Sequence, residues 1–155
     1  SIRRQWHSYL ICSNREYTNQ TQIYKYDMSG KIIEPELSYK IIGLAFEVFN
    51  DLGYGMSEKY CQRAFAGLLE ENKIPFQKEQ YVKLLYRENP IGSYFLDFVI
   101  DKKIVVELKI RPHLGYTHIK QVMGYLKSTG YKLAILIYFT RDGVKYRRII
   151  NERST

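Results

Sequence analysis

The sequence predicts an α/β fold whose elements follow the order helix, helix, three strands, helix, two strands (ααβββαββ). Apolar residues recur at helical spacing in the segments 37–52, 57–72 and 117–129. They alternate with polar residues from residue 76 onwards, and they form one continuous apolar run at 133–139. The 155 residues, 45% of them hydrophobic, suffice for one compact core.

The first 35 residues show no sustained period of either kind. We therefore expect an N-terminal extension with little order of its own at 1–35, followed by one domain at 36–155. Met28, which is followed by Ser29 and Gly30, is a candidate for the natural start of the protein.

The two N-terminal helices have recognisable ends. The first begins after Pro35 and ends at Gly53, because glycine adopts the left-handed conformation that terminates helices. Ser57 is a good N-cap for the second helix, which we expect to end near Asn72.

The strands follow from the alternation of apolar residues and from turn residues between them. Asn89-Pro90 predicts a turn after the first strand, and Asp142-Gly143 predicts one before the last. The predicted strands are 76–86, 93–100, 104–110, 133–139 and 144–150.

Three charged residues interrupt the second and third predicted strands, which are otherwise apolar. Glu107 and Lys109 are two residues apart and therefore point to one face. A three-residue turn after Ile100 pairs it with Ile104, and the same register places Asp97 opposite Glu107. Two carboxylates and an ammonium group are thus predicted to meet on one face.

Two neighbouring carboxylates on a mostly buried hairpin repel each other unless a cation lies between them. Oxygen ligands favour Mg²⁺ or Mn²⁺ over zinc, and magnesium sites leave positions for water and substrate phosphate. The alternative is that Glu107 and Lys109 form an ordinary solvated face and that Asp97 binds a buried donor. The spacing alone does not decide between these interpretations.

The charged residues also carry a family resemblance. Asp97, followed on the next strand by Glu107-Leu108-Lys109, resembles the core of the PD-(D/E)XK nuclease superfamily. The stretch from Glu36 to Asn151 resembles the GxxExxY family, a branch of that superfamily, and Gly55-Met56-Ser57-Glu58 matches its signature. The tyrosine of the signature falls here on Cys61.

The resemblance implies a restriction-endonuclease-like core, in which helices flank a mixed β-sheet. It also implies Mg²⁺ or Mn²⁺ held by Asp97, Glu107 and the Leu108 carbonyl, with Lys109 as the catalytic lysine. Glu58 matches the acid that assists the metal from a helix. An acid in the first turn of a helix also interacts favourably with the helix dipole, so both explanations of Glu58 stay open.

The predicted helix at 117–129 has a polar and aromatic stripe beside its apolar one. Gln121 and Tyr125 resemble the Gln-x-x-x-Tyr element that follows the E-x-K strand in many nucleases of this superfamily. Gln121 is a candidate to orient phosphate or Lys109. Tyr125 is either at the edge of the core or a stacking platform, and His118 is expected to be a surface histidine rather than a metal ligand.

The net charge of +8 arises entirely in the last third of the chain. Residues 1–100 hold 12 basic and 12 acidic residues, whereas residues 101–155 hold 12 and 4. Such an excess of positive charge favours binding to a polyanion such as nucleic acid. A well-solvated surface is an equally simple explanation of the charge. The candidate nucleic-acid contacts are Lys102, Lys103, Arg111, Lys120, Tyr125, Lys127, Lys145, Arg147 and Arg148.

We therefore expect a cytoplasmic, Mg²⁺-dependent nuclease, monomeric or homodimeric, that cleaves DNA more readily than RNA. No apolar run reaches the roughly 20 residues that span a bilayer. The two cysteines, Cys12 and Cys61, are expected to be reduced. One alternative is a non-catalytic module on the same fold that binds nucleic acid or a partner. Another is a dimeric structural protein whose 15 tyrosines line an interface.

Overall fold

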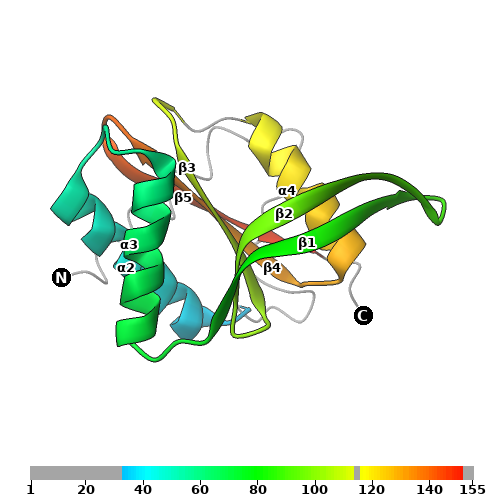
Figure 1. The fold of residues 1–155 in the computed structure, drawn as a ribbon, viewed down its shortest axis with the longest axis horizontal. Helices are drawn as coiled ribbons and strands as arrows, with labels where there is room; N and C mark the ends of the chain where they lie inside the picture. Colours follow the sequence, from blue (N-terminus) through cyan, green and yellow to red (C-terminus); the bar gives the residue numbers. More distant parts are fainter. Residues whose placement is uncertain (1–32, 114–115, 152–155) are drawn as a thin grey trace.

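A computed structural model describes residues 33–113 and 116–151 (Figure 1). The predicted N-terminal extension lies outside the described residues up to position 32, and Pro35 is already the first residue of a helix. The order ααβββαββ is confirmed. The elements are α2 (Pro35–Leu52), α3 (Glu58–Glu71), β1 (Phe76–Tyr86), β2 (Asn89–Ile100), β3 (Ile104–Ile110), α4 (Tyr116–Thr129), β4 (Leu133–Thr140) and β5 (Gly143–Ile150).

The five strands form one mixed sheet in the order β1-β2-β3-β4-β5. Neighbouring strands are antiparallel except β3 and β4, which are parallel and are connected through α4. Every residue of β4 is buried, which explains its continuous apolar sequence.

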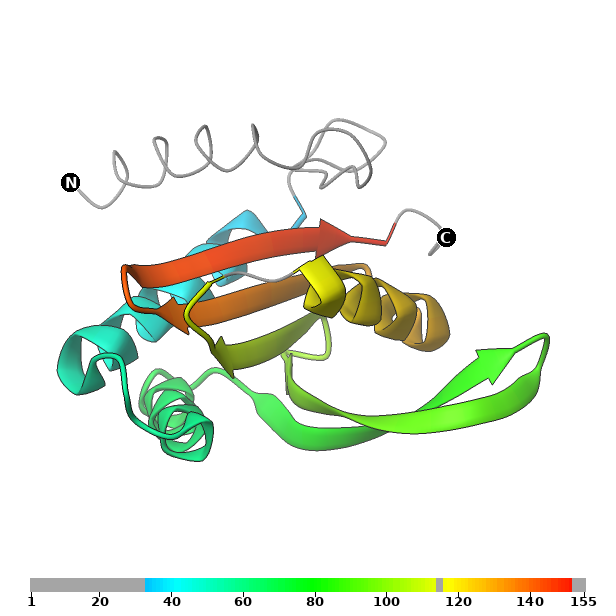
Figure 2. The ribbon, with the colours of Figure 1, turned by 90° about the horizontal axis from the view of Figure 1, so that it is seen from above.

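Helices cover both faces of the sheet, with α2 and α3 on one side and α4 on the other (Figures 1 and 2). Side chains alternate along β3, so that Val106 and Leu108 pack into the core beneath α2 and α3. Val105 packs with α4 instead. The same alternation directs Glu107 and Lys109 away from the α2–α3 core.

The predicted signals at the helix ends are confirmed. The Ser57 hydroxyl accepts a hydrogen bond from the Tyr60 N–H at 3.3 Å and so caps α3. Gly53 ends α2 with a φ of 71°, and its N–H donates to the Phe49 carbonyl. The Ser57 cap fixes the first turn of α3, which contains Glu58.

The turn between β1 and β2 lies two residues earlier than predicted. Arg87 and Glu88 form it, with φ angles of 48° and 68°, while Asn89 and Pro90 already belong to β2. The Asn89 side chain donates a hydrogen bond to the Arg87 carbonyl at 3.1 Å, so it stabilises the turn from the following strand.

The β1–β2 hairpin twists sharply where it leaves the rest of the sheet. Glu79 has a φ of 54°, and on β2 the side chain of Phe98 packs under α2 and α3 while that of Leu96 packs with α4. Backbone pairing between β2 and β3 covers Ile100 to Phe98 only. The two strands therefore separate at Asp97, and an open edge of β3 follows.

Two further observations concern the described residues. Cys61 is a buried free thiol, while Cys12 lies outside them. None of the helices in the described segments has the length and apolar character required to span a membrane.

Candidate active site

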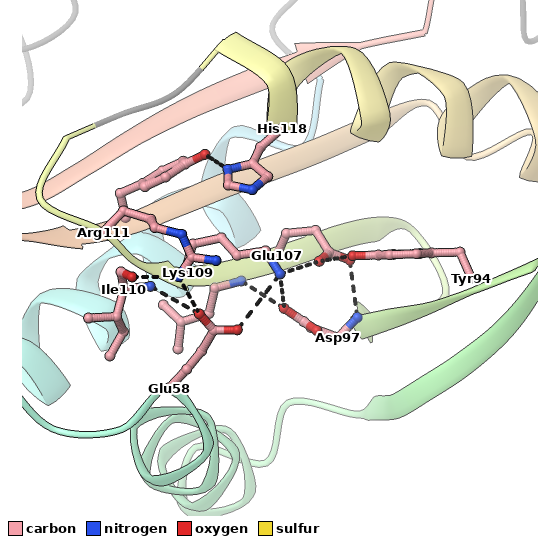
Figure 3. A network of polar contacts seen from close by, with 10 residues as sticks. Glu58, Tyr94, Asp97, Glu107, Lys109, Ile110, Arg111 and His118 are labelled. Carbon is pink, nitrogen blue, oxygen red and sulfur yellow. Dashed lines mark hydrogen bonds and ion pairs between the residues drawn. The ribbon is translucent and has the colours of Figure 1, made fainter.

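Four of the predicted site residues meet where β2 and β3 separate, namely Glu58, Asp97, Glu107 and Lys109 (Figure 3). Ile100 pairs with Ile104, as predicted, and two side chains continue the ladder where backbone pairing stops. The Asp97 N–H donates to Glu107 Oε1 at 3.1 Å, and the Leu108 N–H donates to Asp97 Oδ2 at 3.1 Å. Asp97 and Glu107 thus lie opposite each other, as the turn length predicted.

Glu58 joins these carboxylates from α3. Its Oε2 atom accepts a hydrogen bond from the Ile110 N–H at 3.2 Å, 52 residues further along the chain. The N–H groups of Leu108 and Ile110, on the edge that β2 leaves open, are therefore satisfied by carboxylates from two different elements.

The Lys109 ammonium group lies between all three carboxylates. Its Nζ atom is 3.7 Å from Glu58 Oε1, 3.8 Å from Glu107 Oε2 and 4.0 Å from Asp97 Oδ2. Arg111 adds a second cation, with Nη1 at 3.6 Å from Glu58 Oε2. When all three carboxylates are ionised, the two cations leave one negative charge unbalanced in this carboxylate cluster.

Burial makes the ionised form of these carboxylates unfavourable in free energy. The Glu107 side chain is 1% exposed, and burial together with the charge of Asp97 raises the pKa of Glu107 to about 8. Burial also raises the pKa of Asp97, against the opposing effects of Lys109 and the Leu108 N–H. A proton or a further cation would stabilise the pair.

The donor set suits a divalent cation, but the arrangement is not a ready-made site. Within 33–113 and 116–151, no three acidic, histidine or cysteine side chains are spaced around a common metal position. The ammonium of Lys109 lies at the point on which the carboxylate oxygens converge. Oxygen ligands and an unbalanced negative charge fit Mg²⁺ or Mn²⁺, provided that Lys109 moves aside.

Tyr94 is a member of the site that sequence reasoning missed. Its O–H donates to Glu107 Oε2 at 3.1 Å, and its ring stacks on Tyr125 with the centroids 3.9 Å apart. Burial and the Glu107 charge raise the pKa of Tyr94, so that the phenol keeps the proton it donates. Strict alternation places residues 94 and 97 on opposite faces, and only the twist of β2 brings both to the site.

The predictions for α4 need correction in part. Tyr125 is 5% exposed and packs on Tyr94, so its ring supports the site from the core and offers no face to a base.

The His118 Nδ1 atom hydrogen-bonds with the Tyr138 hydroxyl, and His118 is partly buried near Lys109 and Arg111. Burial and these two cations lower the pKa of His118, which keeps the imidazole neutral. Gln121 is exposed, and no hydrogen bond joins it to the carboxylate cluster in the described segments.

The candidate basic residues do not form one surface. Arg111 borders the cluster, whereas Lys102 and Lys103 lie beyond the opposite end of β3, about 26 Å away along the strand. Arg148 is 9% exposed and donates to the Ile33 carbonyl, so it is not available to a substrate. The other candidates lie on α4 (Lys120, Lys127) and on β5 (Lys145, Arg147).

The fold and the carboxylate cluster define the class of protein: an α/β domain with a restriction-endonuclease-like core. A model of the PD-(D/E)XK nuclease superfamily matches residues 35–149, and the chain belongs to that superfamily. The membership confirms the resemblance carried by Asp97 and Glu107-Leu108-Lys109 at the level of the superfamily.

Comparison with solved structures gives two similar chains. One is described as SSO0001, with a TM-score of 0.47 and 19% identity, over 75% of this chain and 56% of that one. The other is an alkaline exonuclease (LHK-Exo) from Laribacter hongkongensis, with a TM-score of 0.40 and 11% identity, over 74% of this chain and 70% of that one. No curated protein matches the sequence.

Proposed function

We propose that this protein is a nuclease that hydrolyses phosphodiester bonds with the help of Mg²⁺ or Mn²⁺, with DNA as the preferred substrate. Superfamily membership supports the reaction class. The observation that carries the proposal is the convergence of three carboxylates on the Lys109 ammonium at the open edge of β3.

Asp97, Glu107 and the Leu108 carbonyl are the groups that would hold the metal, with Glu58 in support. The Leu108 N–H faces Asp97, and in an extended strand the carbonyl of a residue points to the same side as its N–H. A divalent cation at this position supplies positive charge that activates water and offsets the charge of the phosphate.

The other residues of the site have separate roles in the proposed reaction. Lys109, freed from the carboxylates, orients the attacking water and stabilises the charge that develops on the phosphate. Arg111 holds a phosphate oxygen at the border of the cluster, and Tyr94 fixes the Glu107 carboxylate. Gln121 is a further candidate for binding the phosphate from α4. The match of Gly55-Met56-Ser57-Glu58 supports assignment to the GxxExxY branch.

A cleavage assay across single- and double-stranded DNA and RNA tests the reaction. We expect Mg²⁺- or Mn²⁺-dependent cleavage, strongest on DNA, that EDTA abolishes. Lys109→Met, which keeps the length of the side chain, is expected to lower the rate at least about 100-fold. Lys40→Met on α2 is the matched control and should cleave like the wild type. Equal cleavage by Lys109→Met would refute the assignment of the site.

A second candidate is a module on the same fold that binds nucleic acid or a partner without catalysis. The observation that favours it is that Asp97 and Glu58 cap the open edge of β3, which is a structural role that needs no metal. Calorimetry with Mg²⁺ and Mn²⁺ separates the two candidates. Metal binding that is lost in Asp97→Asn supports the nuclease, and an absence of binding supports the module.

A further inference from the structure

Exposed apolar side chains gather on the β1–β2 hairpin. Nine large hydrophobic side chains are exposed among the described residues, and five of them belong to this one element. These five are Tyr81, Leu85, Tyr86, Ile91 and Phe95, with exposed fractions from 51% to 68%. Figures 1 and 2 show that the hairpin extends beyond the other strands and past the end of α4.

Most of these side chains share one face of the hairpin. Val82 and Leu96 pack into the core beneath α4, so the alternate positions of both strands point outwards. Tyr81 pairs directly with Phe95, and their rings meet edge to face with centroids 5.4 Å apart. We call the outward residues Tyr81, Lys83, Leu85 and Phe95 the hairpin face.

The hairpin face carries positive charge and no carboxylate. Lys83, paired with Ser93, lies next to the Tyr81–Phe95 pair, and Arg87 follows in the turn. The exposed acids of the hairpin lie at its two ends, with Glu88 in the turn and Glu79 at the twist. Aromatic rings interleaved with cations are the combination that binds unpaired bases by stacking and their phosphates by charge.

The hairpin face also lies close to the carboxylate cluster along β2. Phe95 precedes Asp97 by two residues on β2, which corresponds to about 7 Å along the strand. From the Tyr81–Phe95 pair to Leu85 the face extends about 13 Å further. A strand whose phosphate lies at Asp97 could therefore lay its next bases on these rings.

We propose that the hairpin face binds unpaired bases of the nucleic-acid substrate by stacking on Tyr81 and Phe95, with Lys83 contacting the backbone. The proposal rests on the proposed function, because it names the substrate as one with a single-stranded segment beside the phosphate at the site. Both rings are more than half exposed, so their removal leaves the core intact.

Fluorescence anisotropy in EDTA tests binding apart from cleavage. The probe is a labelled oligothymidine of about 15 nucleotides, compared with a blunt duplex of equal length. We expect the full chain to bind the single strand more tightly, and Phe95→Ala and Tyr81→Ala each to weaken that binding about tenfold. Phe95→Trp should retain it. Tyr39→Ala on α2 is the control, and thermal melting verifies the fold of each variant.

The salt dependence separates stacking from charge. Phe95→Ala should leave the slope of log affinity against log salt unchanged. Lys83→Ala should make this slope shallower by about one unit, because about one counterion fewer is released on binding. Wild-type binding by both aromatic variants would overturn the proposal. So would a dimer in sedimentation that Phe95→Ala dissociates without affecting the oligonucleotide, since a second copy would then occupy the face.

The outcomes distinguish this proposal from the nuclease assignment. Stacking-dependent binding by a protein that cleaves nothing in Mg²⁺ or Mn²⁺ would support the hairpin face and refute the proposed reaction. Metal-dependent cleavage with unchanged binding in Phe95→Ala and Tyr81→Ala would support the proposed reaction and refute the role of the hairpin face.

Discussion

Glu107 accepts one hydrogen bond at each carboxylate oxygen, from the Asp97 N–H and from the Tyr94 O–H. The first comes from the backbone of β2, so no side-chain substitution removes it. The second depends on a phenol that buried Tyr125 holds by stacking. We therefore propose Tyr94 as a positioning residue, which would act on the proposed reaction through the orientation and ionisation of Glu107.

Tyr94→Phe tests this role, since it removes the hydroxyl and keeps the stacked ring. We expect about tenfold weaker binding of Mn²⁺ and a similar loss of cleavage, because partners of metal ligands have effects of about this size. Loss of a donor to the carboxylate also raises the pKa of Glu107, so the rise of activity with pH should shift to higher pH.

Tyr131→Phe is the matched control, because it removes a tyrosine hydrogen bond to Gln80 away from the site. A pH profile of Tyr94→Phe that coincides with the wild-type profile would show that Tyr94 serves packing alone.

At the scale of elements, the first turn of α3 connects fold and site. Ser57 caps the helix, and Glu58 directly after it reaches the edge of β3 and two cations. The position of the carboxylate thus depends on the start of the helix. The cap was predictable from sequence, whereas the contact with Ile110 was not, because it joins residues far apart in the chain.

Ser57→Ala should destabilise the protein by about 1 kcal/mol in urea unfolding, the usual effect of losing a serine cap. Fraying of the first turn also displaces Glu58, so cleavage should fall more than the loss of stability explains. Ser128→Ala, an exposed position in α4, should leave both unchanged. Unaltered stability in Ser57→Ala would mean that the bond from the Tyr60 N–H to the Ser57 carbonyl, at 3.1 Å, is sufficient to hold the first turn.

The β2–β3 hairpin shows what local patterns predict and where they fail. The three-residue turn after Ile100 fixed the register, and with it the meeting of Asp97 and Glu107. The twist at Glu79 has no such local signal, since a non-glycine residue with a φ of 54° is uncommon. The contact of Tyr94 with Glu107 depends on that twist. The burial of Tyr125 and of Arg148 depends on packing, and an alternating sequence pattern reveals neither.

At the scale of the whole molecule, the site lies where the sheet divides, between the α3 and α4 sides (Figure 3). Such a location buries two carboxylates, Glu107 almost completely and Asp97 largely, and their charge opposes folding. Raised pKa values of Glu107 and Asp97 are the expression of this cost. The stability of the fold and the proposed chemistry therefore depend on the same two groups.

In EDTA, the free energy of unfolding should fall as pH rises. Folded Glu107 keeps its proton up to about pH 8, whereas the unfolded side chain releases it near its ordinary pKa of 4.5. Unfolding therefore releases a proton between these values, so the stabilisation is complete below pH 4.5 and is lost as pH rises through 8. We expect a loss of a few kcal/mol across this window.

Urea unfolding at a series of pH values measures this loss. Glu107→Gln, which cannot ionise, should show a much flatter dependence, and Mg²⁺ should restore stability to the wild type at pH 8. The same pH dependence in Glu107→Gln and in the wild type would place the titrating group elsewhere.

The most direct test of the central claim is single-turnover cleavage of DNA in Mg²⁺ by Asp97→Asn. Asparagine keeps an oxygen that accepts the Leu108 N–H, so the edge of β3 stays capped while one negative charge is lost. We predict a rate at least about 100-fold below that of the wild type, with Asp51→Asn on α2 as the active control. Thermal stability should equal or exceed that of the wild type, because the variant loses a buried charge that opposes folding. Wild-type cleavage by Asp97→Asn would contradict the assignment of the carboxylate cluster as a metal-dependent nuclease site.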